Sequence, residues 1–459
     1  MRRIARDLAE RALEAAPPGD GALAHVESER SLMLRFARSQ PTQSTSVTDA
    51  RVELAVVCDG HVGRASTNAQ DDEALAACGR RAAEAAEAAA RAGGPGPYPG
   101  LPTTSSPAAH DGHDPETARL DPARGGAALE AAVSAAADRG VEAHGTWTVG
   151  EVEHAVASSA GVLAAERVTD AFMKVVCIAP QGRSGYASGA TVAVGDLDPP
   201  RLAARAAELA ATAGEPAVLE AGEHPVVFEP AAVGELLELL GRCAFNGLLH
   251  AEGQGALAGR LGTLVAAPAI NLSDSPRYGS TLPRSFDAEG MPKGPLPLIQ
   301  DGVAHAVVHD TASAALAGGH STGHASAPGG DPFGPVPSNM VMVGGGAADA
   351  AELALPIERG LYVTRLWYGN VVRADEALVT AVTRDGTFLI EDGEITRPAT
   401  DMRLTDGALG ILASVQALGS RPELVSDGEL YGRRYARGSV CPPLRCGSVR
   451  FTGPAGQRS

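Results

Sequence analysis

The chain has 459 residues, enough for two or three domains, and its hydrophobic content of 44% can build sizeable cores although only 4% of its residues are aromatic. Its formal net charge of -17, from 55 acidic and 38 basic residues, argues against nucleic acid or an anionic membrane as the main partner, because phosphate groups are bound by basic surfaces. No apolar run approaches the roughly 20 residues that span a bilayer, and the N-terminus lacks the apolar core of a signal peptide, so we expect a cytoplasmic protein.

The first half of the sequence alternates strand-like and helix-like segments. An amphipathic helix is predicted at the start, with Ile4, Leu8 and Leu13 on one face, and it ends before Pro17. The repeated order of the later segments predicts an N-terminal α/β domain of two similar strand–helix units, which we place at residues 1–221. These segments are strands within 31–68, a helix at 71–93, a helix at 123–140, strands within 146–179 and a helix at 198–214.

Residues 93–117 interrupt this pattern with a run rich in Gly, Pro and Ser, "GGPGPYPGLPTTSSPAAHDGHDPET". Such a composition is typical of a loop, because Gly and Pro end regular structure and small polar residues are readily hydrated. We therefore expect a long exposed loop between the two units.

The character of the sequence changes at about residue 222. Pro230 begins a helix over residues 230–249 whose apolar positions recur at helical spacing, which predicts one buried helix. Many short β-like runs separated by Gly, Asp and Pro follow, and the segment 383–395 carries two Asp-Gly turn signals. Residues 222–459 are therefore predicted to form a mainly antiparallel β domain, which makes the whole chain α+β.

Two short patterns match catalytic or metal-binding motifs but lack the context that the chemistry needs. Residues 319–323, "GHSTG", match the GxSxG pattern of a nucleophile elbow, but a helix must follow the serine and "HASAPGGDPFGPVP" cannot form one. His320 and His324 lie in the same Gly- and Pro-rich loop, while His305 and His309 are spaced along a β-like stretch. Neither pair is predicted to share a metal ion.

The cysteines favour a reducing environment. No CxxC pair occurs, and Cys58 and Cys177 lie in apolar strand-like runs, which indicates reduced and mostly buried thiols. Cys441 and Cys446 flank the segment "PPLR", and the sequence leaves open whether these two form a bridge. The six cysteines are Cys58, Cys78, Cys177, Cys243, Cys441 and Cys446.

Several long blocks of the second half resemble the TldD/TldE family, in which TldE is also called PmbA. The blocks are "FDAEGMPKGPLPLIQDGV", "HDTASAALAGGHSTGHA", "PSNMVMVGGG" and the segment 357–419, and they occur in the family's order and spacing. Weaker similarity extends into the first half, so that the resemblance spans most of the chain apart from residues 93–117.

Members of the TldD type are zinc peptidases that carry HExxxH on the helix matching residues 230–249, with a further cysteine ligand near the C-terminus. The two histidines of that motif hold the metal, and the glutamate is the general base for the metal-bound water. Laying the motif on this helix places its His, Glu and His on Glu238, Leu239 and Cys243. Leucine cannot accept a proton and Cys441 does not match the family's C-terminal cysteine. The resemblance therefore implies a TldE-like chain with no catalytic residue and no metal of its own.

In this family a TldE-type chain pairs with a TldD-type chain, which alone carries zinc, and the peptide substrate is threaded as an extended strand. The resemblance thus implies a heterodimer that acts as a metallopeptidase or amide hydrolase on extended peptides or on a pathway intermediate. A homodimer is conceivable as a resting state. Two alternatives remain open. One is an enzyme whose metal site is rebuilt from Glu238, Cys243 and a histidine of another loop, and the other is a metal-free module that binds peptides or small molecules.

The candidate substrate contacts lie in two Gly- and Pro-rich loops, which are explained equally well as turns that the fold requires. They are Phe286, Asp287, Glu289, Gly290, His320, Ser321, Thr322 and Gly323.

Overall fold

The computed structural model describes residues 4–103, 105–426 and 433–455. Its first sheet has six antiparallel strands in the order β3-β2-β1-β4-β5-β6. Two units with the same order of elements, a helix, strands and a helix, share this sheet and meet where β1 pairs with β4. The first unit contains α1 (Ile4–Glu14), β1 (Gly21–Ala37), β2 (Gln40–Cys58), β3 (His61–Thr67) and α2 (Asp72–Gly93). The second contains α3 (Pro122–Asp138), β4 (Glu142–Ser158), β5 (Leu163–Ile178), β6 (Ser184–Thr191) and α4 (Pro199–Ala211).

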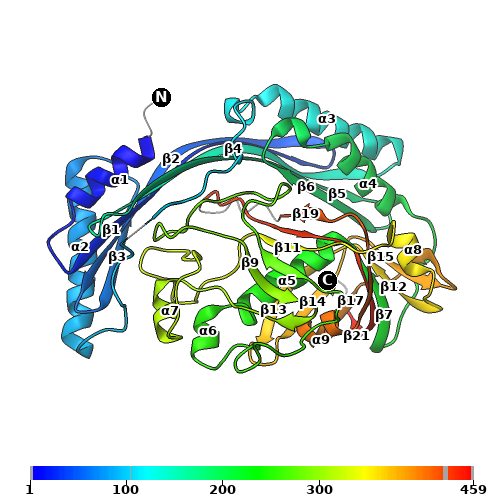
Figure 1. The fold of residues 1–459 in the computed structure, drawn as a ribbon. Helices are drawn as coiled ribbons and strands as arrows, with labels where there is room; N and C mark the ends of the chain where they lie inside the picture. The colour runs from blue at the N-terminus through cyan, green and yellow to red at the C-terminus, as the bar shows by residue number, and fades with distance from the viewer. Residues whose placement is uncertain (1–3, 104, 427–432, 456–459) are drawn as a thin grey trace.

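This first sheet is a long arch that carries its helices on the outer face and covers the rest of the chain with its inner face (Figure 1). The alternation of side chains along a strand explains the arrangement. Ala22, Ala24 and Val26 of β1 join the apolar core beneath α1 and α2. The intervening His25 and Glu27 lie on the inner face, where they meet loops from the second half of the chain. The predicted α+β fold with two related strand–helix units is confirmed.

The second half of the chain forms two further sheets, which are mainly antiparallel. The larger has nine strands, in the order β13-β14-β17-β21-β7-β12-β15-β16 with β18 paired to β21, and the smaller has six, in the order β10-β9-β8-β11-β20-β19. The larger sheet contains β7 (Gly222–Phe228), β12 (Arg359–Val363), β13 (Leu366–Arg373), β14 (Leu378–Thr383), β15 (Thr387–Glu391), β16 (Glu394–Pro398), β17 (Met402–Gly407), β18 (Val415–Leu418) and β21 (Leu444–Pro454). The smaller sheet contains β8 (Leu272–Asp274), β9 (Leu296–Gln300), β10 (Val303–Ala304), β11 (Met340–Met342), β19 (Glu423–Val425) and β20 (Ser439–Cys441).

Helix α5 (Pro230–Cys243) is the buried helix that the sequence predicts, and its apolar side chains join strands of both sheets in one core. The predicted end at residue 249 is wrong, because the helix stops at Cys243 and a second helix, α6 (Gly247–Ala251), starts in a new direction. The side chain of Asn246 accepts the backbone N–H groups of Leu248 and Leu249, which caps α6. Gly247 has no room for a side chain, since a Cβ there would lie 2.2 Å from the carbonyl oxygen of Val308.

The other helices of this half are short, and they are α7 (Thr311–Leu316), α8 (Ala350–Ala354) and α9 (Ala408–Ala413). None of the described helices combines the length and the apolar character that crossing a membrane requires.

The loop between the two units is not wholly exposed, contrary to the sequence-based expectation. Tyr98 is 7% exposed, and its hydroxyl group donates a hydrogen bond to Glu289 of the second half. His110 is also largely buried, and its Nε2 lies 2.9 Å from the carboxylate of Glu166 on β5. The loop therefore contacts the second half through Tyr98 and the arch through His110, although most of its other described residues face water.

The stretch containing His305 and His309 is not a strand, contrary to its β-like composition. Only Val303 and Ala304 pair regularly with β9, and a single bridge joins Val308 to Asn246. His305 is exposed at the surface, whereas His309 is half-buried with its ring beside Ser313.

Candidate functional site

Helix α5 directs the three positions that match the family's metal motif to different surroundings. Glu238 has 32% of its side chain exposed, and its carboxylate contacts Arg242 and, at 3.3 Å, Arg437. Leu239 and Cys243 are 1% and 0% exposed, within the core between the two sheets. The three side chains therefore do not converge on a shared point at the surface.

The thiols near α5 are unsuited to metal binding, which requires a thiolate. Cys243 Sγ donates a hydrogen bond to the carbonyl oxygen of Leu239 at 3.1 Å, and burial raises the pKa of this thiol to about 11. Cys441 is 0% exposed and donates to the carbonyl oxygen of Pro230, at the opposite end of the helix and about 20 Å from Cys243 along its axis. Glu238, Leu239 and Cys243, with Cys441, do not fit a zinc ion.

A groove of about 260 Å³ opens along the exposed side of α5, between the arch and the two sheets. The arch is tied to the larger sheet beside it, because the guanidinium of Arg365 lies 3.9 Å from the ring centre of Tyr186 and 2.8 Å from Asp385. The lining carries both signs of charge and aromatic rings, a combination suited to polar, extended ligands. Residues that line it include Lys174, Tyr186, Glu235, Glu238, Arg365 and Trp367.

The first candidate segment from the sequence is buried and braces the loop in which it lies. Phe286 packs in an apolar cluster with residues of β1, β4 and β5. Asp287 accepts the backbone N–H groups of Glu289, Met291 and Ala325 at 2.9, 2.9 and 2.8 Å. A carboxylate that satisfies three backbone donors fixes the path of the chain. Phe286 is 6% exposed and Asp287 is 8% exposed. Their surroundings are therefore those of residues that hold the fold together.

Glu289 and Gly290 complete this segment and lie against the arch. Glu289 is 0% exposed; it accepts the hydroxyl of Tyr98 at 2.9 Å and the backbone N–H of Thr311 at 3.1 Å. Gly290 has φ of 77°, and a Cβ there would lie 2.6 Å from a side-chain carbon of Val162, so that only glycine fits. Burial, and then the neighbouring carboxylate of Asp287, raise the pKa of Glu289 above its ordinary value of 4.5.

Glu289→Gln is expected to flatten the pH dependence of stability. Because the folded-state pKa of Glu289 is raised, its neutral form stabilises the native state below about pH 4.5, and this contribution is lost as pH rises through the folded-state value. Glutamine keeps the shape and stays neutral. Urea unfolding at pH 5 and pH 8 should show a smaller fall for the variant than for the native chain. Equal falls would mean that Glu289 is ionised throughout this range.

The second candidate segment reaches the surface only in part. His320 is exposed, Ser321 and Thr322 are half-buried, and Gly323 is buried with a φ of 76°. Ser321 donates its hydroxyl to the carbonyl oxygen of His309 at 3.3 Å, and Thr322 does the same at 3.1 Å. No helix or strand occurs between residues 317 and 339, all of which are described, so Ser321 lacks the strand–turn–helix setting of a nucleophile elbow.

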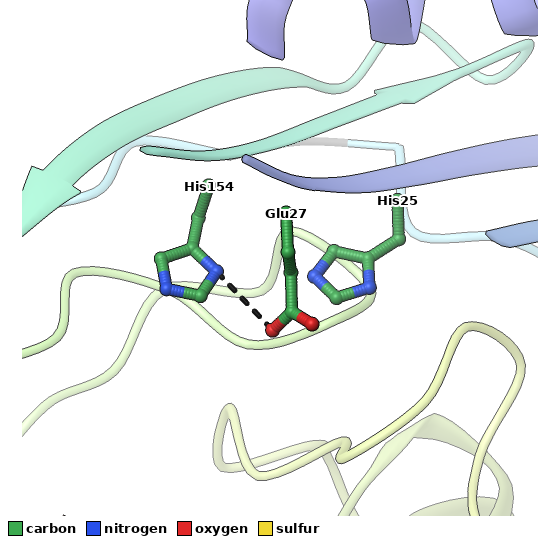
Figure 2. Close-up of side chains that lie close together, drawn as sticks. All are labelled: His25, Glu27 and His154. Atoms are coloured by element: carbon green, nitrogen blue, oxygen red, sulfur yellow. Dashed lines mark ion pairs between the residues drawn. The ribbon is translucent and has the colours of Figure 1, made fainter. Parts of the chain in front are cut away.

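A cluster that the sequence did not indicate lies on the inner face of the arch. Figure 2 shows His25 and Glu27 of β1 and His154 of β4 with their polar atoms turned toward one another. One ligand atom of each lies within 4.8 Å of the others, and His154 Nδ1 is 3.5 Å from Glu27 Oε1. On the far side of its ring, His25 Nδ1 lies 3.4 Å from the carboxylate of Glu53. Two histidines and a carboxylate at this spacing raise the question of a metal ion.

The guanidinium groups around this cluster argue against a metal ion there. Arg284 Nη1 lies 2.6 Å from His154 Nε2, and because arginine only donates, that nitrogen must accept. The neutral ring then carries its proton on Nδ1, facing Glu27. Burial, and then Arg284, hold the pKa of His154 well below its ordinary value, so this ring stays neutral. Arg433 lies 3.4 Å from Glu27 and provides its counter-charge. The cluster therefore consists of the neutral ring of His154 beside a carboxylate, Glu27, that is already paired with arginine. It does not fit a divalent cation.

Models of the three domains of the PmbA/TldA metallopeptidases match the chain in order: domain 1 at residues 26–90, the central domain at 121–213 and the C-terminal domain at 221–453. The chain belongs to this family. The resemblance found in the sequence is thereby confirmed over most of the chain's length.

Known structures share the whole fold of this family member. TldE from Thermococcus kodakarensis superposes with a TM-score of 0.84 over 98% of this chain and 100% of its own, at 20% identity. A protein from Thermotoga maritima described as a candidate modulator of DNA gyrase gives a TM-score of 0.80 over 94% of this chain and 96% of its own, also at 20% identity. At this level of identity the likeness concerns the fold alone.

Curated relatives match a shorter segment. A metalloprotease from Methanothermobacter thermautotrophicus is 28% identical over 201 residues, which cover 43% of each chain. A metalloprotease TldD homologue from Haemophilus influenzae is 24% identical over 212 residues, which cover 44% of this chain and 42% of the relative. The chain thus spans less than half the length of the curated relatives that it matches.

Proposed function

We propose that this family member is a non-catalytic, TldE-like subunit that pairs with a zinc-carrying TldD-type subunit to hydrolyse peptide or amide bonds. The observation that carries the proposal is the surroundings of α5. The position of the motif's general base holds Leu239, which packs in the core, and the position of its second histidine holds Cys243, whose thiol is buried and bonded to the backbone. Glu238 is engaged by two arginines.

The sequence offers no replacement base next to a histidine ligand. None of the 12 histidines is followed by glutamate, so the pair of metal ligand and base on one helix occurs nowhere in the chain. A zinc peptidase needs a general base beside the metal-bound water. Under the proposal, both are supplied by the partner subunit, and one of the curated relatives is named a metalloprotease TldD homologue.

In this proposal the present chain contributes binding surface for an extended peptide or another amide substrate. The groove along α5 has room and mixed charge for such a ligand. Among the substrate contacts predicted from sequence, His320, Ser321 and Thr322 reach the surface, and we retain these as candidates. The six unpaired cysteines suit the reducing cytoplasm, where we place the complex.

The test is the metal content and activity of the chain with and without a partner. The chain is purified alone, and again after co-expression with a TldD-type subunit carrying HExxxH, and zinc is measured by mass spectrometry. We expect no stoichiometric zinc in the lone chain, about one zinc per pair in the complex, and peptide hydrolysis only in the complex. A partner whose motif glutamate is changed to glutamine provides the matched inactive control.

Other outcomes would select the alternatives. Stoichiometric zinc in the lone chain that is lost in Glu238→Ala or Cys243→Ala would establish a rebuilt metal site and overturn the proposal. Peptide binding by the lone chain, with no complex formed and no hydrolysis in the mixture, would instead show a metal-free binding module. The groove along α5 is the feature that favours this second alternative.

A further inference from the structure

Strand β2 extends well beyond its outer neighbour and leaves part of the arch with an open edge. Although β2 begins at Gln40, β3 pairs only with residues 52–58 of it. Residues 40–49 are exposed, apart from the half-buried Thr45 and Val47. In the described part of the chain, no backbone group bonds to the outer side of residues 42–50. A strand with a free edge and open faces is a template for pairing with another strand.

The register shows which residues of β2 offer this edge. Asp59 and Gly60 form the two-residue turn to β3, with φ of 48° and 72°, so Cys58 and His61 are its flanking hydrogen-bonded pair. Backbone groups alternate in direction along a strand, and every second residue before Cys58 therefore points away from β1 as far as the register shift, which leaves Thr42 without a partner on β1. On the open edge these residues are Ser44, Ser46 and Thr48.

The sequence protects this edge at its two ends and not between them. Pro41 and a register shift between Arg35 and Phe36 disturb the end near the hairpin turn. Asp49 and Arg51 place charges at the other end. Charges, proline and irregularities are the usual means by which edge strands avoid pairing. The segment between them, "QSTSVT" at residues 43–48, has none of these.

An apolar hollow lies at the same end of the arch, which makes the incomplete surface larger than the edge. It has a volume of about 740 Å³ and lies between the β1–β2 hairpin and α3. Ser44 belongs both to the open edge and to the lining of this hollow. The apolar lining residues include Leu34, Phe36, Leu129 and Val133.

Residues 43–47 are complementary to themselves in antiparallel orientation. With Thr45 of two copies facing each other across a two-fold axis, Ser44 meets Ser46 and Gln43 meets Val47. Ser44 and Ser46 are both directed outward, which is the parity that a hydrogen-bonded pair requires. Hydroxyl side chains directly opposite one another also form favourable cross-strand pairs. No like charges meet within the segment.

We infer that a second copy of this chain pairs with residues 43–47 of β2, so that two arches join edge to edge in a symmetric homodimer. A two-fold axis is the commonest symmetry of homo-oligomers, and it places the same patch on both subunits. The inference concerns the chain by itself and does not rest on the zinc-carrying partner.

Cross-linking tests the register of the pairing. Facing Thr45 residues form a non-hydrogen-bonded pair, with Cα atoms about 4.5 Å apart, a distance that suits a disulfide. Thr45→Cys should therefore yield an oxidised dimer on a non-reducing gel. Gln43→Cys is the matched control on the same face. In this register the two introduced thiols are about 13 Å apart along the strands, so no cross-link is expected.

Light scattering of the native chain should give twice the 46.6 kDa of one chain. Ser46→Pro removes an outward N–H and leaves the ladder to β1 intact, so it should give monomers at the same concentration with unchanged circular dichroism. A monomeric native chain, or a dimer without the Thr45→Cys cross-link, would overturn the inference. A cross-link that forms only to a co-expressed TldD-type subunit would assign this edge to that chain and overturn it equally. None of these results depends on zinc content or hydrolysis, which test the proposed function.

Discussion

Replacing Asp170 with asparagine is expected to lower the free energy of unfolding by about 3–5 kcal/mol, because it leaves a buried arginine without its counter-charge. Arg434 Nε and Nη2 donate to the two carboxylate oxygens of Asp170 at 2.7 and 2.6 Å, and Nη1 donates to Thr148 at 2.9 Å. Only 2% and 8% of the two charged side chains are exposed. Urea unfolding, followed by circular dichroism at pH 7, measures the change.

The matched control is an ion pair of the same chemistry at the surface. Arg373 contacts Asp375 and Glu376 at 2.8 Å, with about half of each side chain exposed. Because water already solvates these groups, Arg373→Ala is expected to leave the free energy of unfolding unchanged within error. A loss for Asp170→Asn as small as that of the control would mean that the segment around Arg434 does not anchor the second half of the chain to the arch.

The local elements of the arch could be predicted from sequence because their signals are short-range. The helices at 71–93, 123–140 and 198–214 are found at α2, α3 and α4 within a few residues, where Ala-rich amphipathic runs follow an N-terminal Asp or Pro. The repeated order of strands and helices indicated two related units. The curvature of the sheet and its pairing across β1 and β4 depend on contacts between distant residues, which no periodicity reveals.

The predicted helix over 230–249 is in fact two helices, α5 and α6, which shows how a periodic apolar pattern can hide the end of a helix. The apolar spacing continues past Cys243 because Ala244 and Phe245, which lie between the two helices, are also buried in the core. The local signal was the Asn246-Gly247 pair, in which asparagine is a preferred N-cap and glycine permits close packing. The prediction of one helix over 230–249 followed the hydrophobic periodicity and so missed this signal. The exposed-loop prediction for 93–117 failed at Tyr98 and His110 for another reason, since both are held by partners far along the chain.

The candidate site was predictable only where the family resemblance reached it. Alignment of the motif marked Glu238, Leu239 and Cys243, and the structure adds that two of them are in the core. The cluster of His25, Glu27 and His154 had no signal in sequence, because it forms only when β1 and β4 pair in register. The open edge of β2 needed the register too, since the composition of residues 42–48 is ordinary for a strand.

Leu239→Glu is expected to destabilise the fold by about 4 kcal/mol or more, because it combines loss of a buried leucine with burial of a carboxyl group. Leu239 is 1% exposed and packs beneath β13, where its Cδ1 lies 3.1 Å from the point that a Cβ on Gly369 would occupy. The introduced carboxyl group must be neutral in this core, so its folded-state pKa is raised. The loss should therefore grow between pH 5 and pH 8, as urea unfolding at both values would show.

Glu238→His is the matched control, since it changes the neighbouring residue on the exposed side of the same helix and should fold at both pH values. The triple change Glu238→His, Leu239→Glu and Cys243→His then restores the residues of the HExxxH motif but not the geometry that a metal site requires. We expect this variant to be less stable and to hold no stoichiometric zinc. The helix must be repacked against β13 before residue 239 can face a metal-bound water. A triple variant that folds and binds zinc would contradict this reading. It would mean that the scaffold still holds a peptidase geometry and that only side chains separate this chain from its catalytic relatives.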